Sequence, residues 1–381
     1  MLDMKEPMLP FDEDDFDGVK YYKEEDGSIK IVVYLTIPYF KAKLYVDGKP
    51  YTDCFNDREP YDHQTHFYRV PADVISNLSV LMFTAYSDPD GGELFYTIVP
   101  CINPEFAQDD ALLDEYNSRI TVESEKKETV CDGVEYSHML CSDKNGAPVH
   151  MFLLTVDTGK ASLYAGTPDD GYESRNVKAK VPEMIDSAVE NGVNAVAAVN
   201  ADFFDMFGDC SPSGLCVKNG RVVANADSKR PFIGIKKDGT PVLATLEEYP
   251  ELIDELDCAV SGLEMIVKDG RIFQWGPLEP FSYVRHPRTA AGLTKDGKVL
   301  LLVVDGRIPS YSNGASLVDL AEFMIARGAD RAVNLDGGGS SVIYTKKDGE
   351  FVFHSNPADL FRPNDKLIRE EFNCIIVTAK E

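Results

Sequence analysis

Apolar residues recur at helical spacing in two segments of the chain, and each segment leads into a short apolar run typical of a buried strand. Each predicted helix begins at a proline or a capping-box serine and ends before a glycine. The helix–strand units are Pro182 to Gly192 with residues 195–199, and Ser316 to Gly328 with residues 331–335. A third apolar strand is expected over residues 299–304.

Turn sequences recur through the second half of the chain. Each places Asn-Gly or Asp-Gly between apolar or β-branched runs, which is a strong signal for a β-hairpin. The five turns end at Gly220, Gly239, Gly270, Gly297 and Gly349. Hairpins pair strands antiparallel, whereas helix–strand units are typical of parallel pairing, so we expect a mixed sheet. The predicted class of the catalytic domain is therefore α+β or mixed α/β, with many hairpins and with packed helices on the sheet.

The first hundred residues differ from the rest because they hold short β runs and no clear helical pattern. Runs of this kind with glycine-containing turns predict a small, sandwich-like β domain. The stretch that follows is polar and acidic, as in a linker. We expect an accessory domain over residues 1–107, a linker over residues 108–127 and a catalytic domain over residues 128–381.

A carboxylate follows each of the three apolar strands. The three segments are Asn200-Ala201-Asp202, Asp305-Gly306-Arg307 and Asn334-Leu335-Asp336. Ligands commonly bind at the carboxyl ends of strands in open sheets, so convergence of these acids would define a site. The last segment continues into three glycines and two serines, whose amides and hydroxyls can approach an anion closely. A glycine-rich hairpin beside a solvated Asp336 is the alternative interpretation of this stretch.

These motifs, with Phe203-Phe204, Arg288-Thr289-Ala290 and the Ser312–Leu317 approach to the second helix, resemble the phosphodiester glycosidase family. The resemblance covers the chain from Thr129 to the C-terminus. Two segments depart from the family pattern. Ala201-Asp202 stands where many members have Ala-Gly or Gly-Asp, and Arg369-Glu370-Glu371-Phe372-Asn373 replaces an Arg-Val-x-Asn pattern. Arg369 is therefore not among the predicted site residues.

The resemblance implies a glycoside hydrolase that removes an α-linked sugar, with N-acetylglucosamine as a candidate, from a sugar-1-phosphodiester. Glycoside cleavage normally needs two carboxyl groups. The expected catalytic residues are Asp336, Asp305 and Asp202. The expected substrate-binding residues are Asn200, Phe204, Arg288, Thr289, Arg307, Asn334, Gly337, Gly338, Gly339, Ser340 and Ser341. Asp202 and Asp336 are also candidate oxygen ligands for Ca²⁺ or Mg²⁺, and no organic cofactor is expected.

The composition and net charge of the chain indicate which kinds of molecule it can bind. The chain has 381 residues, 44% of them hydrophobic, and a formal net charge of −26. This charge argues against nucleic acid and anionic membranes as partners, because both attract basic surfaces. A phosphate must then be held locally, and Arg288, Arg285 and Arg307 are its natural partners. The expected ligand is a carbohydrate or a sugar phosphodiester, and no apolar run is long enough to span a bilayer.

Two other functions remain open from the sequence. One is an α-glycosidase that acts on ordinary or anionic glycosidic linkages, and the other is a non-catalytic carbohydrate-binding protein. The eight cysteines show no zinc spacing; Cys210 with Cys216 and Cys131 with Cys141 could form bridges, but reduced core thiols are the preferred interpretation. No apolar signal-peptide region follows Met1, so the expected location is cytoplasmic for a complete sequence and extracytoplasmic for a trimmed one.

Overall fold

The computed structural model describes residues 120–380, apart from residues 144–145, 207, 274–284, 309 and 359–367, and the backbone of seven strands nearer the N-terminus. The chain divides into two compact units, Met1–Asn117 with Gly276–Val284, and Ser118–Trp275 with Arg285–Glu381. No helix among the described residues has the length and apolar character needed to cross a membrane.

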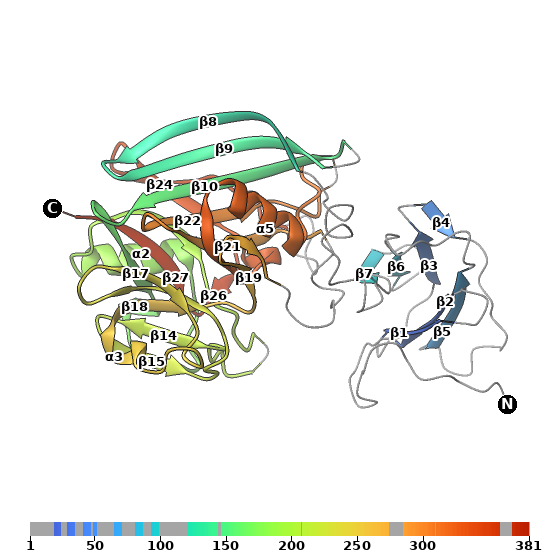
Figure 1. The fold of residues 1–381 in the computed structure, drawn as a ribbon, viewed down its shortest axis with the longest axis horizontal. Coiled ribbons are helices and arrows are strands. Elements are labelled where there is room, and N and C mark those ends of the chain that lie inside the picture. The colour runs from blue at the N-terminus through green and yellow to red at the C-terminus, as the bar shows by residue number, and fades with distance from the viewer. Residues whose placement is uncertain are drawn as a thin grey trace. The chain divides into compact units, whose positions relative to one another are not determined.

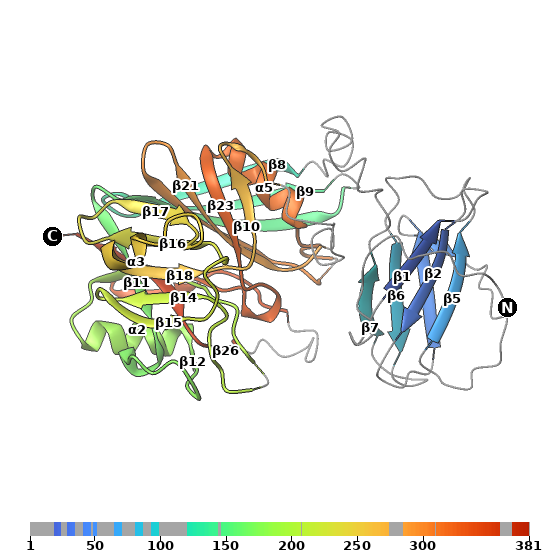
Figure 2. The ribbon, with the colours of Figure 1, turned by 60° about the horizontal axis from the view of Figure 1, so that its bottom comes forward.

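The first unit contains two antiparallel sheets, drawn in blue in Figures 1 and 2. The three-stranded sheet has the order β1 (Val19–Lys23), β2 (Ile29–Tyr34), β5 (Thr65–Val70). The four-stranded sheet has the order β4 (Lys49–Tyr51), β3 (Lys41–Val46), β6 (Leu81–Tyr86), β7 (Glu93–Ile98).

The second unit is built from sheets in which every described strand pair is antiparallel. The largest sheet has eight strands in the order β20 (Arg271–Ile272), β19 (Met265–Lys268), β23 (Ala329–Leu335), β21 (Arg288–Thr294), β22 (Lys298–Val304), β10 (Pro148–Asp157), β9 (Val134–Ser142), β8 (Thr121–Cys131). Its long strands β8, β9 and β10 run along one side of the unit (Figure 1).

Two five-stranded sheets and a short two-stranded one complete the unit. The first has the order β11 (Ala161–Gly166), β27 (Cys374–Ala379), β13 (Ala195–Asn200), β24 (Ile343–Lys347), β25 (Glu350–Phe353). The second has the order β15 (Arg221–Asn225), β14 (Leu215–Lys218), β18 (Leu256–Ser261), β16 (Phe232–Lys236), β17 (Pro241–Ala244). Strand β12 (Ala179–Lys180) pairs with β26 (Glu370–Glu371).

The expected α+β or mixed α/β class is wrong, because the second unit is predominantly β and its sheets are antiparallel. Three α-helices occur among the described residues: α2 (Val181–Glu190), α3 (Leu252–Glu255) and α5 (Leu317–Ala326). Helix α2 contacts β13 and α5 contacts β23. Strand β13 is buried throughout and apolar up to Asn200: Ala197 and Val199 join the core shared by the three larger sheets, while Ala195 and Ala198 pack in the cluster with α2. The continuous apolar run of β13 therefore reflects burial of both faces of the strand and does not indicate parallel pairing.

The predicted turns and helix cap agree with the structure, although the predicted fold class does not. All five predicted turns join antiparallel neighbours, β14–β15, β16–β17, β19–β20, β21–β22 and β24–β25. The predicted capping box is present, since the Ser316 hydroxyl accepts a hydrogen bond from the amide of Asp319 and the Asp319 carboxylate accepts one from the amide of Ser316. Residues 121–127 of the expected linker belong to β8, and the other domain limits stay a prediction.

The cysteines in the described part of the chain are free thiols. They are Cys131, Cys141, Cys210, Cys216, Cys258 and Cys374. The two bridges considered from the sequence are therefore not formed, and the preferred interpretation of reduced thiols agrees with the structure. Burial raises the pKa of Cys216 to about 12, so this thiol is protonated and chemically inert at neutral pH.

Candidate active site

The ends of β13 and β23 are tied together, although the two strands belong to different sheets. The amide of Asp336 donates to the carbonyl of Ala201 at 2.9 Å, and the Asn200 side-chain amide donates to the carbonyl of Asp336 at 2.6 Å. Asp202 and Asp336 therefore lie near each other, as the two strand-end motifs predicted. Burial is the main cause of the raised pKa of Asp202, and the negative charge of Asp336 adds to it, as expected for neighbouring carboxyl groups.

Asp336 is held by its own loop. Its Oδ1 accepts a hydrogen bond from the Gly337 amide at 2.9 Å, and its Oδ2 accepts one from the Ser340 hydroxyl at 2.7 Å. Burial raises the pKa of Asp336 to about 6, against the opposing effects of the Ser340 hydrogen bond and of the positive charge on Arg369. The carboxyl group is thus largely ionised at neutral pH and is poised to accept a proton.

Asp202 lies deeper, with 2% of its surface exposed. Its amide donates to the side-chain oxygen of Asn373 at 2.9 Å, and the Asn373 amide group donates to its Oδ2 at 3.2 Å. Burial raises the pKa of Asp202 well above its usual range. The pair therefore combines Asp202, whose raised pKa favours the neutral form, with Asp336, which is ionised at neutral pH; neighbouring carboxyl groups divide acid and base roles in this way.

The glycine loop forms a short turn, η2 (Gly338–Ser340). The amide of Gly338 donates to the carbonyl of Pro287 at 2.8 Å, and the amides of Ser340 and Ser341 donate within the loop. The Gly338 amide is therefore engaged and does not serve the anion cradle that the sequence suggested. Gly338 has a φ of +65°. A Cβ there would lie 3.0 Å from the Arg307 guanidinium, so the glycine lets this arginine pack directly on the loop.

Three of the predicted substrate-binding residues form a buried, hydrogen-bonded cluster. Asn200, Thr289 and Ser341 have no exposed surface. The Thr289 hydroxyl donates to the Asn200 side-chain oxygen at 2.8 Å and lies 3.3 Å from the Ser341 hydroxyl. The Asn200 oxygen also accepts from the amide of Val342 at 3.2 Å. These residues join β13, β21 and the glycine loop, so their role in the structure is to fix the loop under Asp336.

Arg288 is buried and Arg307 is partly exposed. The Nε of Arg288 donates to the carbonyl of Ala315 at 3.1 Å, and burial lowers the pKa of Arg288 to about 9 while the charge of Glu264 opposes this. Arg288 thus remains a cation at neutral pH. Arg307 has a φ of +62° and donates to the carbonyl of Ala358 at 3.2 Å, and its charge lowers the pKa of Asp336.

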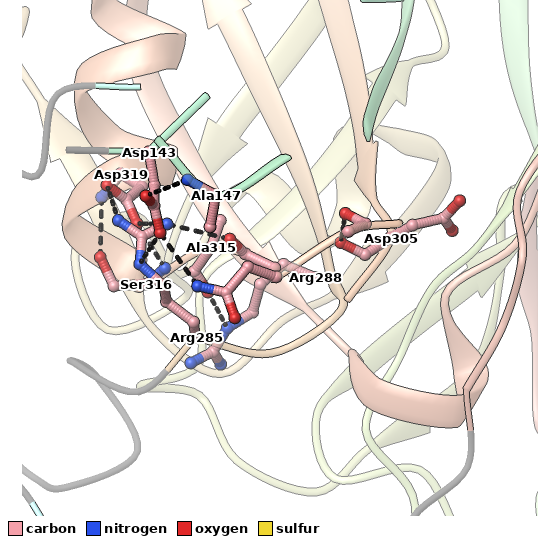
Figure 3. A network of polar contacts seen from close by, with 11 residues as sticks. Asp143, Ala147, Arg285, Arg288, Asp305, Ala315, Ser316 and Asp319 are labelled. Carbon is pink, nitrogen blue, oxygen red and sulfur yellow. Dashed lines mark hydrogen bonds and ion pairs between the residues drawn. The ribbon is translucent and has the colours of Figure 1, made fainter. Parts of the chain in front are cut away.

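Asp305 does not join the pair. Its Oδ2 accepts from the Tyr311 hydroxyl at 2.9 Å, and its Oδ1 accepts from the amide of Asn356 at 2.8 Å. Figure 3 shows Asp305 to the right of the polar network around Arg285. Burial raises the pKa of Asp305 to about 6, but neither Asp202 nor Asp336 is among the charges that act on it. Asp305 therefore anchors the loop that carries Tyr311. Phe204 packs against the core, and its backbone forms an isolated bridge with Pro212.

Sequence reasoning missed three polar residues of the site. Arg369 donates to the Ser340 hydroxyl at 3.1 Å, and Asn373 makes both hydrogen bonds to Asp202. Both stand in the C-terminal segment whose altered pattern led us to omit Arg369. Glu264 accepts from the Asn334 side-chain amide at 3.0 Å, which places a further carboxylate next to β23. No motif marks Glu264, because it precedes β19 in an ordinary apolar context.

The expectation of Ca²⁺ or Mg²⁺ at Asp202 and Asp336 stays a prediction. No group of three or more His, Cys, Asp or Glu side chains suited to a metal occurs among the residues described. Calcium takes about six to eight oxygen ligands. Both oxygens of Asp336 already accept hydrogen bonds, and two arginine charges act on it. This donor set is a poor fit for either ion, and no step below uses a metal.

Comparison with known proteins shows which enzymes the chain is similar to. The curated mouse N-acetylglucosamine-1-phosphodiester alpha-N-acetylglucosaminidase is 32% identical over 174 residues, which cover 41% of this chain and 32% of the mouse protein. The bovine enzyme of the same name is 33% identical over 162 residues, covering 38% and 30%. The chain thus spans about a third of the length of these relatives, which are by name glycosidases and so hydrolases.

A solved structure shares the fold. The zebrafish N-acetylglucosamine-1-phosphodiester alpha-N-acetylglucosaminidase catalytic domain, auto-inhibited by its pro-peptide, superposes with a TM-score of 0.54 at 21% identity, covering 68% of this chain and 89% of that one. Residues 193–377 match the sequence model described as phosphodiester glycosidase. This match lies within the part of the chain whose motifs resemble that family, and it confirms the resemblance.

Proposed function

We propose that this protein is a glycoside hydrolase that releases an α-linked sugar from a sugar-1-phosphodiester. The observation that carries the proposal is the pair Asp202 and Asp336, joined through the ends of two strands, with Arg307 and Arg369 acting on Asp336. The family match and the names of the relatives support a phosphodiester as the substrate and N-acetylglucosamine as the first sugar to test.

In the proposed reaction, Asp336 accepts a proton from water as the water oxygen bonds to the anomeric carbon. The bond between that carbon and the phosphate oxygen breaks, and its electron pair leaves with the phosphate. Asp336 suits this role because its pKa of about 6 leaves it ionised at neutral pH. The raised pKa of Asp202 favours its neutral form beside Asp336, which limits the negative charge in one buried place.

The leaving group needs little proton donation, because a phosphate monoester is a weak base. It instead needs compensation of the negative charge that grows on the departing oxygen. Arg369 donates a hydrogen bond to Ser340 in the loop of Asp336, and Arg307 packs on Gly338. Arg288 contributes positive charge from its buried position, held by Ala315. We assign the phosphate mainly to Arg307 and Arg369.

The deciding experiment compares two substrates that share N-acetylglucosamine in α linkage, one a methyl phosphodiester and one an aryl glycoside. The wild-type protein is expected to hydrolyse the phosphodiester, and Asp336→Asn to lose at least about a hundredfold in kcat/KM. Asp348→Asn, in the β24–β25 hairpin turn, is the matched control and should retain full activity.

Two outcomes would favour the other functions. Faster turnover of the aryl glycoside would indicate an ordinary α-glycosidase, provided that the pH profile of kcat/KM also shows the ionisation of a group that donates a proton to the departing alcohol. Binding of N-acetylglucosamine phosphate by the wild type, measured by calorimetry, without turnover of either substrate, would indicate a carbohydrate-binding protein.

A further inference from the structure

Three glycines from two loops of the site pack on the backbone of His286 and Pro287. A Cβ on Gly306 would lie 2.6 Å from the Pro287 nitrogen, one on Gly314 would lie 2.6 Å from the His286 carbonyl oxygen, and one on Gly337 would lie 2.8 Å from the Pro287 carbonyl oxygen. Side chains cannot approach backbone atoms this closely. The loops that carry Arg307 and Asp336 are thus positioned by direct contact with this dipeptide.

Hydrogen bonds link the same dipeptide to the loops. His286 and Ala315 exchange backbone hydrogen bonds at 3.1 and 3.0 Å, and the Pro287 carbonyl accepts the amide of Gly338. The Ala315 carbonyl in turn accepts the Nε of Arg288. Any shift of residues 286–288 would therefore be transmitted both to the glycine loop and to a buried cation of the site.

Arg285 precedes this dipeptide and anchors it. Its Nη1 lies 3.2 Å from Oδ2 of Asp319 and donates to the Gly314 carbonyl at 3.0 Å, and its Nε lies 3.7 Å from Oδ2 of Asp143. Asp143 also accepts hydrogen bonds from the amide of Ala147 and the side chain of Asn313. Figure 3 shows Arg285, Asp143 and Asp319 converging from three segments of the chain.

The environment of Arg285 suits a structural cation and not a phosphate ligand. Its side chain is 17% exposed, and the side chains of Asp143 and Asp319 are 1% and 0% exposed. Two buried carboxylates already balance its charge. An incoming phosphate would have to displace one of them, which would leave a buried negative charge without compensation.

We propose that Arg285 is a positioning residue, which together with Asp143 and Asp319 fixes the 286–288 segment and thereby sets the placement of the glycine loop and Arg288. This inference rests on the proposed function for its effect on turnover, but its structural part does not. Lysine cannot replace the guanidinium, because a single ammonium group cannot bond Gly314 and reach both carboxylates in the same planar arrangement.

The kinetic test uses Arg285→Lys with Arg331→Lys as the matched control. Arg331 is 18% exposed, lies 3.6 Å from Glu248 and donates to the Leu243 carbonyl at 3.0 Å, so it is as buried as Arg285 and also combines an ion pair with a backbone hydrogen bond, away from the loops. Arg285→Lys is expected to lower kcat on the sugar phosphodiester by about tenfold or more, with KM changed far less, because misplaced groups slow the chemical step. Equal kinetics in the two variants would overturn the proposal.

A second measurement does not require turnover. Amide hydrogen exchange is expected to quicken in Arg285→Lys at Gly338 and Ala315, whose backbone bonds depend on the 286–288 segment, while β13 keeps its protection. Arg331→Lys should leave exchange at these amides unchanged. If the wild type hydrolyses neither substrate, the proposed function fails, and the exchange data still decide the positioning role. Unchanged exchange at Gly338 and Ala315 in a folded Arg285→Lys variant would refute it.

Discussion

Alanine at Gly338 tests whether the contact between the glycine loop and Arg307 matters for turnover. Two effects of the added Cβ can be separated. The φ of +65° is unfavourable for alanine, and the Cβ would lie 3.0 and 3.1 Å from the two terminal nitrogens of Arg307. The guanidinium is the end of a flexible side chain, so it should move aside at little cost to stability. Its displacement should instead appear in the kinetics.

Gly349 provides the control for the backbone effect. Its φ is +91°, and a Cβ there would meet nothing within 4 Å. Both alanine variants should therefore lose roughly 1–2 kcal/mol of unfolding free energy from the left-handed backbone alone. Gly338→Ala should also lose about tenfold in kcat/KM on the phosphodiester, which corresponds to about 1.4 kcal/mol of transition-state stabilisation.

The assay pairs denaturant unfolding of both variants with steady-state kinetics on the N-acetylglucosamine phosphodiester. Similar destabilisation with a selective kinetic loss in Gly338→Ala is the expected result. If kcat/KM of Gly338→Ala stays within about twofold of that of Gly349→Ala, Arg307 does not act from its place on the loop and the argument for its role fails.

Further predictions concern the carboxyl groups. Activity should rise with pH through about 6 as Asp336 ionises, and wild-type kcat/KM that is flat from pH 5 to 8 would contradict this. Because the folded pKa of Asp336 lies above its ordinary 3.8, this group destabilises the fold as pH rises from about 4 through about 6, so Asp336→Asn should raise Tm more at pH 8 than at pH 4. Arg369→Met should move the acidic limb of kcat/KM to higher pH, since Arg369 lowers the pKa of Asp336; an unmoved limb would show that its charge is screened. Asp305→Asn should cost far less in kcat than Asp336→Asn, and equal losses would return Asp305 to the catalytic group.

The sequence by itself determined the local features of this protein. The glycine of each Asn-Gly or Asp-Gly turn has a positive φ, and in the turn at Asn219 and Gly220 both residues do, at +49° and +70°. The capping box at Ser316 likewise involves residues three apart. Such features depend on neighbours within a few positions, so they can be predicted without knowledge of the fold.

The tertiary structure decided which of the strand-end acids act together. From sequence Asp305 and Asp336 look equivalent, since each follows an apolar strand. The hydrogen bond from Asn200 to Asp336 joins residues 136 positions apart and brings Asp336 to Asp202, whereas Tyr311 and Asn356 hold Asp305 elsewhere. The direction in which strands pair depends on contacts between distant residues, so it cannot be predicted from a local pattern. A continuous apolar run shows only that both faces of a strand are covered, and here sheets and single helices cover both faces of antiparallel strands.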